Sequence, residues 1–325
     1  MKAAVVHEWG QQPAYTDFPD PQPADGTEVA TVEASALTNL TRAVISGKHY
    51  SSKEISLPAI AGVDGVARLA NGKRVYSGSL APYGMMAERT VVHPAGAVEV
   101  PEHVDSVTAA AIPNPGISAW LALSHGAAVQ PGQHVLVLGA TGVTGSLAVQ
   151  LAKSVFGAGQ VTVSGRNTER LDWLRTVGAD DVITLGNDDL TEAITARHAA
   201  RPFDAVLDYL WGSPAEHTLK ALAASHPSAH FHATRFVQIG AMTGETISVD
   251  ASTLRSTGIT LAGVGIGSVP PEALLQARTE ALPKLFAMVD SGDLQLQTLA
   301  RPLADIEAVW ASQEPSGVRV VVTPQ

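Results

Sequence analysis

Residues 134–152, HVLVLGATGVTGSLAVQLA, run an apolar strand into a glycine-rich turn that opens a helix. In such a turn, free backbone N–H groups and the positive end of the helix face one point, which suits a phosphate group. The dinucleotide-binding pattern is G-x-G-x-x-G, and Ala140, Gly142 and Gly145 occupy its three glycine positions. Glycines that only permit tight strand–helix packing are the alternative. Because strand and helix both sit where the pattern requires them, we predict a pyrophosphate site lined by Ala140, Thr141, Gly142, Val143, Thr144 and Gly145.

The next strand indicates which dinucleotide binds. An enzyme that uses NAD usually carries Asp or Glu about 20 residues after the glycine turn, bonded to the ribose hydroxyls. Here Ser164, Gly165 and Arg166 follow the strand and offer a hydroxyl, a bare backbone and a guanidinium. These groups suit the 2′-phosphate of NADP(H). The alternative for Arg166 is an ordinary solvated arginine.

On either side of this turn, the chain shows two different patterns of predicted secondary structure. Residues 116–265 alternate strands with helical stretches, which predicts a parallel sheet with right-handed crossovers. Residues 1–115 hold short β-like runs separated by turn residues, typical of a small, mostly antiparallel domain. A helix over 271–291, with a break before Pro283, and a strand over 318–322 complete the chain. Sixty residues make a marginal core alone, so we expect 266–325 to pack on the first domain rather than form a third.

The predicted elements of the parallel sheet follow one another at short intervals. We expect strands over 134–138, 160–164, 181–185, 205–209 and 236–239, and helices over 145–155, 168–176, 190–197 and 214–224.

Composition limits the classes of function. The chain has 325 residues, 45% of them hydrophobic, enough for about two domains with buried cores. It has no cysteine, which excludes disulfides, thiolate-bound metals and cysteine nucleophiles. A net charge of −10 opposes binding to nucleic acid or to an anionic membrane. No signal-peptide pattern or membrane-length apolar run is present, so we expect a cytoplasmic protein whose partners are small molecules.

Several short segments occur in a shared order along the whole chain. They are residues 1–3 (MKA), 58–65 (PAIAGVDG), 109–113 (AAAIP), 116–120 (GISAW), 177–183 (VGADDVI) and 203–208 (FDAVLD). With the glycine turn, these segments make the chain resemble the medium-chain dehydrogenase/reductase superfamily, in its zinc-independent quinone oxidoreductase branch.

The resemblance implies an α/β fold with two domains and a cofactor cleft between them. A GroES-like, mostly antiparallel catalytic domain would comprise 1–115 and 266–325, and a Rossmann domain with a doubly wound parallel sheet would comprise 116–265. NADPH would give hydride to a quinone or an α,β-unsaturated carbonyl. A zinc-free alcohol or aldehyde oxidoreductase, or an NADPH-binding sensor with little turnover, remains the alternative. The resemblance also implies a homodimer joined through edge strands.

Further site residues are carried over by the same resemblance. The turn at 116–118 and the loop at 239–243 would lie near the nicotinamide, which nominates Ser118, Ile239, Gly240 and Ala241. The later cofactor-flanking loop would contain Gly265, Ile266 and Gly267. Tyr50 matches a tyrosine that lines the family's substrate cleft and could hydrogen-bond a carbonyl oxygen, although it could also be an ordinary loop residue.

Other candidates come from position in the sequence. Asn39 and Thr41 could face the substrate or serve the local helix. Tyr209 and Leu210 end the fourth strand at the carboxyl edge of the sheet, where they could flank the cofactor or pack in the core.

No metal is expected. Zinc-dependent relatives carry Gly-His-Glu where this chain has Gly62-Val63-Asp64, and they usually need cysteine ligands. Residues 226–232 hold three histidines without a carboxylate at a suitable spacing, so we interpret them as a solvated loop. The basic and tyrosine residues that often support the 2′-phosphate in the family lack clear matches, which leaves Arg166 to carry more of that task.

Overall fold

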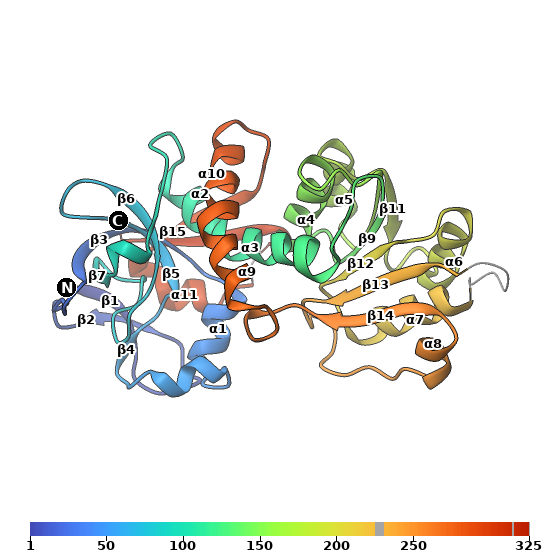
Figure 1. Ribbon diagram of the computed structural model, residues 1–325. Helices are drawn as coiled ribbons and strands as arrows, with labels where there is room; N and C mark the ends of the chain where they lie inside the picture. The colour runs from blue at the N-terminus through green and yellow to red at the C-terminus, as the bar shows by residue number, and fades with distance from the viewer. Residues whose placement is uncertain (225–230, 314, 325) are drawn as a thin grey trace. The chain divides into compact units, whose positions relative to one another are not determined.

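The computed structural model describes residues 1–224, 231–313 and 315–324. The chain divides into two compact units (Figure 1): unit 1 comprises Met1–Asn114 and Arg278–Gln325, and unit 2 comprises Pro115–Ala277. The chain therefore starts in unit 1, leaves it and returns. Its return falls after helix α9 (Pro271–Gln276), later than the residue 266 expected from sequence.

Unit 2 is built on one parallel sheet of six strands in the order β11-β10-β9-β12-β13-β14. The strands are β9 (His134–Leu138), β10 (Gln160–Gly165), β11 (Asp181–Thr184), β12 (Ala205–Asp208), β13 (Ala233–Gln238) and β14 (Gly258–Gly263). The chain first builds outward from β9 on one side and then crosses to the other, which is the doubly wound order. The topological switch therefore lies between β9 and β12, at whose carboxyl ends such sheets bind ligands.

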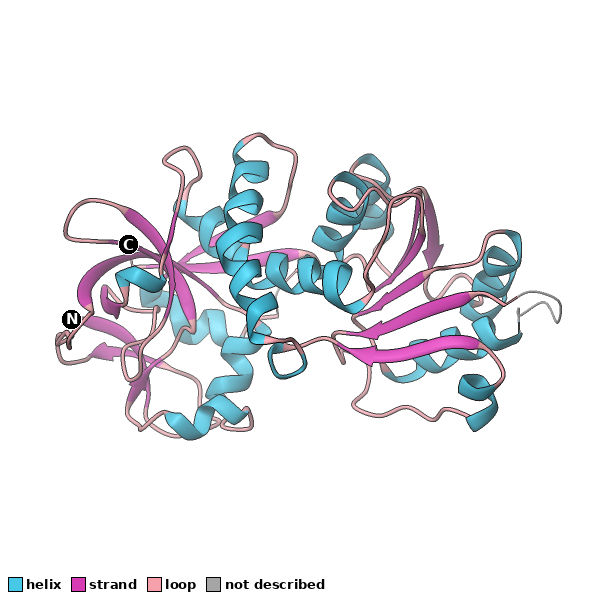
Figure 2. Cartoon of the chain, viewed as in Figure 1, coloured by secondary structure: helices cyan, strands magenta, loops and turns pink. Residues whose placement is uncertain are grey.

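Helices alternate with these strands and flank them (Figure 2). They are α4 (Val143–Ser154), α5 (Thr168–Thr176), α6 (Leu190–Ala200), α7 (Gly212–Ala224) and α8 (Ala251–Arg255). Because helices cover a parallel sheet on both faces, its central strands are mainly apolar. In β9, the four residues 135–138 are all fully buried, and Leu136 and Leu138 pack with Phe203 and Phe236.

Unit 1 contains two sheets. A three-stranded antiparallel sheet joins β2 (Ala14–Asp17), β1 (Lys2–Val6) and β4 (Ala59–Ile60). The larger sheet has the order β15-β16-β3-β5-β6-β8, and β7 also pairs with β3. Its strands are β15 (Gln297–Pro302), β16 (Val318–Thr323), β3 (Glu28–Ala36), β5 (Asp64–Arg68), β6 (Arg74–Gly78), β8 (Val98–Glu99) and β7 (Arg89–Val92).

The helices of unit 1 lie beside these sheets. They are α1 (Asn39–Ile45), the 3-10 helix η1 (Tyr50–Glu54), α2 (Ser106–Ala111), α10 (Leu282–Asp290) and α11 (Ile306–Ala311). The expected break before Pro283 is confirmed, because a π-helical turn over Ala277–Ala281 separates α9 from α10.

The C-terminal segment completes unit 1 rather than forming a third domain. Strand β16 pairs with β3, and the Arg319 guanidinium donates to the carbonyl of Leu37 at 2.9 Å. Leu303 and Ile306 pack in one cluster with Leu37. All strand pairs of unit 1 are antiparallel except β15 with β16, so the predicted fold class, a mostly antiparallel domain and a doubly wound parallel sheet, is confirmed.

The structure differs from the sequence analysis at several places, among them residues 116–118 and 297–302. The expected turn at 116–118 is wrong, because these residues lie inside helix α3 (Pro113–Leu121), where Gly116 continues the helix. Strand β15 was not predicted. Its mixed sequence QTLARP and its largely exposed residues lack the alternation that marks a strand, and only the long parallel pairing with β16 fixes it.

Candidate functional site

The glycine turn after β9 is fastened to the neighbouring strand. The N–H groups of Gly139 and Ala140 both donate to the carbonyl of Ser164, at 3.1 and 2.9 Å. Gly142 then takes the N-cap position of α4, and no side chain caps this helix. The N–H groups of Val143, Thr144 and Gly145 donate to no acceptor within the described residues. The first turn of α4 thus presents a set of free donors and the positive end of a helix dipole.

The glycines of this turn have different tasks. Gly139 has a φ of +78°, and a Cβ there would lie 2.8 Å from Leu210 Cδ2. A Cβ on Gly145 would lie 2.6 Å from the carbonyl oxygen of Gly139. Gly142 has an ordinary φ of −73°, and a Cβ there would meet nothing closer than 3.5 Å. Packing therefore requires Gly139 and Gly145, whereas Gly142 leaves open space before the free donors.

Two of the predicted residues at the end of β10 offer groups without protein partners. The Ser164 hydroxyl is fully buried and makes no hydrogen bond within the described residues. Arg166, two residues later, is exposed and forms no hydrogen bond or ion pair there. Since a buried hydroxyl without a partner is unfavourable, Ser164 marks a place where a polar ligand atom would be stabilised.

A second arginine, which the sequence analysis missed, lies in the first turn of α5. Arg170 is only 6% exposed, yet its three guanidinium nitrogens have no hydrogen-bond partner within the described residues. The guanidinium lies over the ring of Trp173 at 4.1 Å, and burial lowers its pKa although Glu169 opposes the shift. A buried guanidinium whose N–H groups have no hydrogen-bond acceptor is costly, so an anion bound here would be favoured.

The turn after β12 is held from two sides. Asp208 is fully buried, and its carboxylate accepts hydrogen bonds from the N–H groups of Leu210 and Trp211 at 2.8 and 3.1 Å. Burial raises the pKa of Asp208 to about 6, although these hydrogen bonds oppose the shift. From the loop after β13, the Thr243 hydroxyl donates toward the carbonyls of Leu210 and Trp211. This support holds Trp211 at a positive φ of 57°, a strained conformation for a bulky residue.

Tyr209 and Leu210 occupy different places in this turn. The Leu210 side chain packs against Gly139 and so borders the glycine turn. Tyr209 is 8% exposed, its hydroxyl has no partner within the described chain, and burial raises the pKa of its phenol. The structure therefore brings both of these predicted residues to the carboxyl edge of the sheet.

The residues expected near the nicotinamide are brought together only in part. The N–H groups of Ile239 and Gly240 donate to the carbonyl of Asp208 at 2.8 and 3.1 Å, which joins this loop to the turn after β12. Ala241 is exposed beside them. Ser118 is half-buried in α3, and 265–267 form an exposed 3-10 segment, with Ile266 57% exposed. Their roles stay predictions.

The substrate candidates lie in unit 1, on two adjoining helices. The hydroxyl of Ser52 in η1 donates to the carbonyl of Val44 in α1 at 2.7 Å. Tyr50 is exposed and its ring lies 4.2 Å from that of His49. Thr41 is fully buried and its hydroxyl pairs with that of Thr38, the N-cap of α1, so its contacts are those of a helix cap. Asn39 is exposed at the start of α1.

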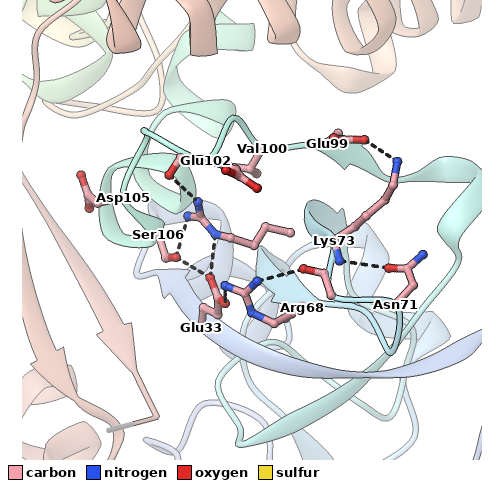
Figure 3. A pocket seen from close by; sticks show the side chains of 11 residues that line it. Glu33, Arg68, Asn71, Lys73, Glu99, Val100, Glu102, Asp105 and Ser106 are labelled. Carbon is pink, nitrogen blue, oxygen red and sulfur yellow. Dashed lines mark hydrogen bonds and ion pairs between the residues drawn. The ribbon is translucent and has the colours of Figure 1, made fainter.

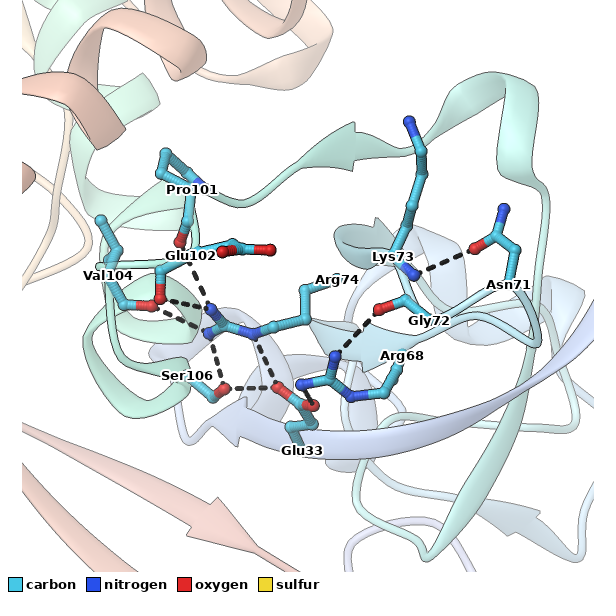
Figure 4. A network of polar contacts seen from close by, with 10 residues as sticks. All are labelled: Glu33, Arg68, Asn71, Gly72, Lys73, Arg74, Pro101, Glu102, Val104 and Ser106. Carbon is cyan, nitrogen blue, oxygen red and sulfur yellow. Dashed lines mark hydrogen bonds and ion pairs between the residues drawn. The ribbon is translucent and has the colours of Figure 1, made fainter.

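A polar pocket of about 880 Å³ also lies in unit 1 (Figure 3). Among the residues that line it, the Glu33 carboxylate forms ion pairs with the guanidinium groups of Arg74 at 3.0 Å and Arg68 at 2.6 Å (Figure 4). Arg74 also donates to the Val104 carbonyl and the Ser106 hydroxyl. Burial alone would raise the pKa of Glu33, but the hydrogen bonds from Ser106 and Arg74 and the nearby arginine charges hold it below its usual value. Since the arginines are committed to protein groups, this network is structural.

The histidine segment at 226–232 is described only in part. Residues 225–230, and with them His226 and His230, lie outside the described residues. His232 is engaged with the Phe203 carbonyl at 3.1 Å and with Asp204 at 3.4 Å. In the described part of the chain, no group of three or more His, Asp or Glu side chains is arranged to hold a metal ion. The same part contains no helix with the length and apolarity of a membrane span.

A doubly wound sheet with a glycine turn and free donors at its switch point defines a dinucleotide-binding protein. Comparison with known proteins narrows the class. Residues 143–283 match the family model described as zinc-binding dehydrogenase. The probable NADPH-dependent quinone reductase tdiC of Emericella nidulans is 28% identical over the whole of both chains. The trans-enoyl reductase pgmF of Aspergillus terreus is 27% identical over 49% of this chain and 42% of its own.

A solved structure extends the likeness to the complete fold. The quinone oxidoreductase from Thermus thermophilus, also described in complex with NADPH, is 25% identical and has a TM-score of 0.78, covering 99% of this chain and 100% of its own. The chain is similar over its whole length to the quinone oxidoreductase type of the medium-chain dehydrogenase/reductase superfamily.

Proposed function

We propose that the protein is an NADPH-dependent reductase that transfers hydride to a quinone or an α,β-unsaturated carbonyl. The observation that carries this proposal is the set of unsatisfied polar groups in unit 2. Free N–H donors begin α4, and the buried guanidinium of Arg170 has no hydrogen-bond partner in the described chain. The relatives named as NADPH-dependent quinone reductase and trans-enoyl reductase support the cofactor and the two substrate classes.

The residues present fit NADP(H) at two anionic groups. The N–H groups of residues 143–145 and the open space at Gly142 fit the pyrophosphate. Arg166 and Arg170, with the unpartnered Ser164 hydroxyl, fit the dianionic 2′-phosphate. The remaining proposed contacts form the wall and the nicotinamide end: Ser118, Thr141, Tyr209, Leu210, Ile239, Gly240, Ala241, Gly265, Ile266 and Gly267.

NADPH supplies the hydride when it is bound. The chain supplies positioning and a polar environment, and the reaction needs no covalent nucleophile. Leu210, packed on Gly139, and the turn held by Asp208 fix one wall of the site and keep water from it. On the substrate we propose that the Tyr50 phenol donates a hydrogen bond to the carbonyl oxygen, which stabilises the negative charge that develops there. Asn39 is a second proposed donor. The hydroxyl of Thr41 is a weaker candidate because Thr38 already engages it.

The experiment that tests this function follows NADPH oxidation by stopped flow with a panel of quinones, enones and simple aldehydes. We expect oxidation with quinones or enones and little with aldehydes. Oxidation by aldehydes alone would favour an alcohol or aldehyde oxidoreductase. Tight NADPH binding without oxidation by any compound would overturn the reductase and favour a sensor.

We further propose that the protein forms a homodimer through β14. This strand ends the six-stranded sheet, and it has only one partner among the described strands. An open edge of unpaired backbone groups is a ready surface for pairing with a second copy. Sedimentation should give twice the mass of one chain, and a monomer at all concentrations would refute the dimer.

A further inference from the structure

Gly165 occupies the position at which an NAD enzyme carries its ribose-binding acid. It is the last residue of β10 and lies 20 residues after Gly145. No positive φ requires a glycine there. The requirement is steric, because a Cβ on Gly165 would overlap Cγ2 of Thr141 and would lie 3.0 Å from its Oγ1 and 3.2 Å from its Cβ.

Rotation of Thr141 relieves this overlap only in part. A threonine side chain places two heavy atoms in two of the three staggered positions around its Cα–Cβ bond. Cγ2 and Oγ1 now fill the two positions that face Gly165, so every other rotamer still leaves a heavy atom in at least one of them. Alanine at position 141 would leave both empty.

Backbone movement is also opposed. The N–H groups of Gly139 and Ala140 donate to the carbonyl of Ser164, the residue before Gly165. On the other side, the N–H of Leu185 donates to the carbonyl of Gly165 at 2.8 Å. The glycine turn and the end of β10 are therefore held at a fixed separation, and Thr141 is itself 8% exposed.

We propose that Thr141 restricts position 165 to glycine and thereby keeps out the acid that would favour NADH. Its side chain fills the space beside Gly165 and prevents a carboxylate at this position from reaching the ribose hydroxyls of NADH. The end of β10 is thereby left to the guanidinium groups of Arg166 and Arg170, which select the 2′-phosphate. The turn after β9, which contains Thr141, thus helps to determine which residue can stand at the end of β10. The inference rests on the proposed use of NADPH.

The steric part is tested by thermal unfolding, which needs no cofactor. Gly165→Ala should lower the melting temperature by roughly 3 to 8 °C, in line with overpacking of a close-packed site. Thr141→Ala in the same chain should recover most of the loss. Thr141→Val keeps the shape of threonine and is the matched control, so it should recover nothing. A Gly165→Ala variant as stable as the parent, or equal recovery by alanine and valine, would overturn the exclusion.

The selectivity part is tested by measuring the Kd of NADPH and of NADH by fluorescence titration. Gly165→Asp alone should lower the melting temperature and weaken both cofactors. Combined with Thr141→Ala, the same aspartate should bind NADH at least about tenfold better than NADPH, whereas Thr141→Ala alone should still prefer NADPH. An unchanged NADPH preference in the double variant, or a switch produced by Gly165→Asp without loss of stability, would refute the role of Thr141.

These outcomes are separable from failure of the proposed function. If the parent protein binds neither cofactor, the reductase proposal itself is wrong. If the parent binds NADPH and the double variant does not switch, only the inference about Thr141 fails.

Discussion

Gly142 and Gly145 are the second and third glycines of the dinucleotide pattern, and the structure predicts opposite results when each is changed to alanine. At Gly145 a Cβ would lie 2.6 Å from the Gly139 carbonyl oxygen and 2.8 Å from Ala140 Cα. Both are backbone atoms, so the turn itself must move. At Gly142 the backbone angles suit alanine and the nearest atom would be 3.5 Å away.

The magnitudes follow from these contacts. For Gly145→Ala, overpacking costs about 1 to 3 kcal/mol, and weakening the two hydrogen bonds to Ser164 adds about 1 kcal/mol. Better helix propensity returns about 1 kcal/mol, which leaves a net loss near 2 kcal/mol. At 2 to 4 °C per kcal/mol for a domain of this size, the melting temperature should fall by about 4 to 8 °C. Gly142→Ala should change the free energy of unfolding by under about 1 kcal/mol.

NADPH binding, in contrast, should be affected directly by the change at Gly142. A methyl group at Gly142 enters the open space before the free N–H groups, so the Kd for NADPH should rise at least about tenfold at unchanged stability. The assay pairs differential scanning calorimetry with NADPH titration on both variants. A stable Gly145→Ala protein, or a Gly142→Ala protein that melts early and binds normally, would refute the assignment of packing to one glycine and ligand access to the other.

Five further substitutions test other parts of the structure. Arg170→Met should weaken NADPH by about 10- to 100-fold, leave NADH binding nearly unchanged and raise the melting temperature, because an unpaired buried cation is removed. Arg166→Ala should weaken NADPH similarly without that rise in stability, and equal loss of NADH in either titration would contradict the 2′-phosphate role. Asp208→Asn should stabilise the protein above pH 6. Burial raises the pKa of Asp208 from 3.8 to about 6, so the protonated side chain favours the folded state below pH 4, and this stabilisation is lost as the pH rises through 6. Urea unfolding at pH 4 and pH 8 measures this, and a destabilised variant at pH 8 would exclude it. Arg74→Met should cost about 3 kcal/mol because it removes the ion pair with Glu33 from a largely buried position and leaves several carbonyls without their donor. Arg68→Met, a control on the same carboxylate from a more exposed position, should cost under about 1 kcal/mol.

The parallel sheet could be predicted closely because its signals are local. The strand at 134–138 and the helix at 168–176 are confirmed to the residue. Apolar runs, helix-capping residues such as Asn167 and the glycine turn act within a few positions, so one stretch of sequence is sufficient.

Where tertiary packing decides, the sequence was not sufficient. Gly116 looked like a turn residue, but α3 continues through it. Arg170 looked like one more charged residue on a helix, and only the fold shows that it is buried without a partner. Strand β15 depends on β16 rather than on its own pattern. The substrate candidates Tyr50, Asn39 and Thr41 stay predictions for the same reason, since their roles depend on groups distant in the sequence.

Several glycines of unit 2 outside the dinucleotide pattern lie where the loop after a neighbouring strand comes close to the backbone. Gly139 is pressed by Leu210 of the turn after β12, Gly165 by Thr141, and a Cβ on Gly240 would lie 2.7 Å from the Tyr209 carbonyl. Each bare backbone lets a neighbouring connection approach the carboxyl edge of the sheet more closely than a side chain would permit. The pattern G-x-G-x-x-G describes one connection, whereas the close packing of the site extends across four strands. If one of these glycines is replaced by a larger residue, the lost stability should therefore be recovered by a smaller residue in the loop that follows the neighbouring strand. A second substitution within the glycine's own loop should not recover it.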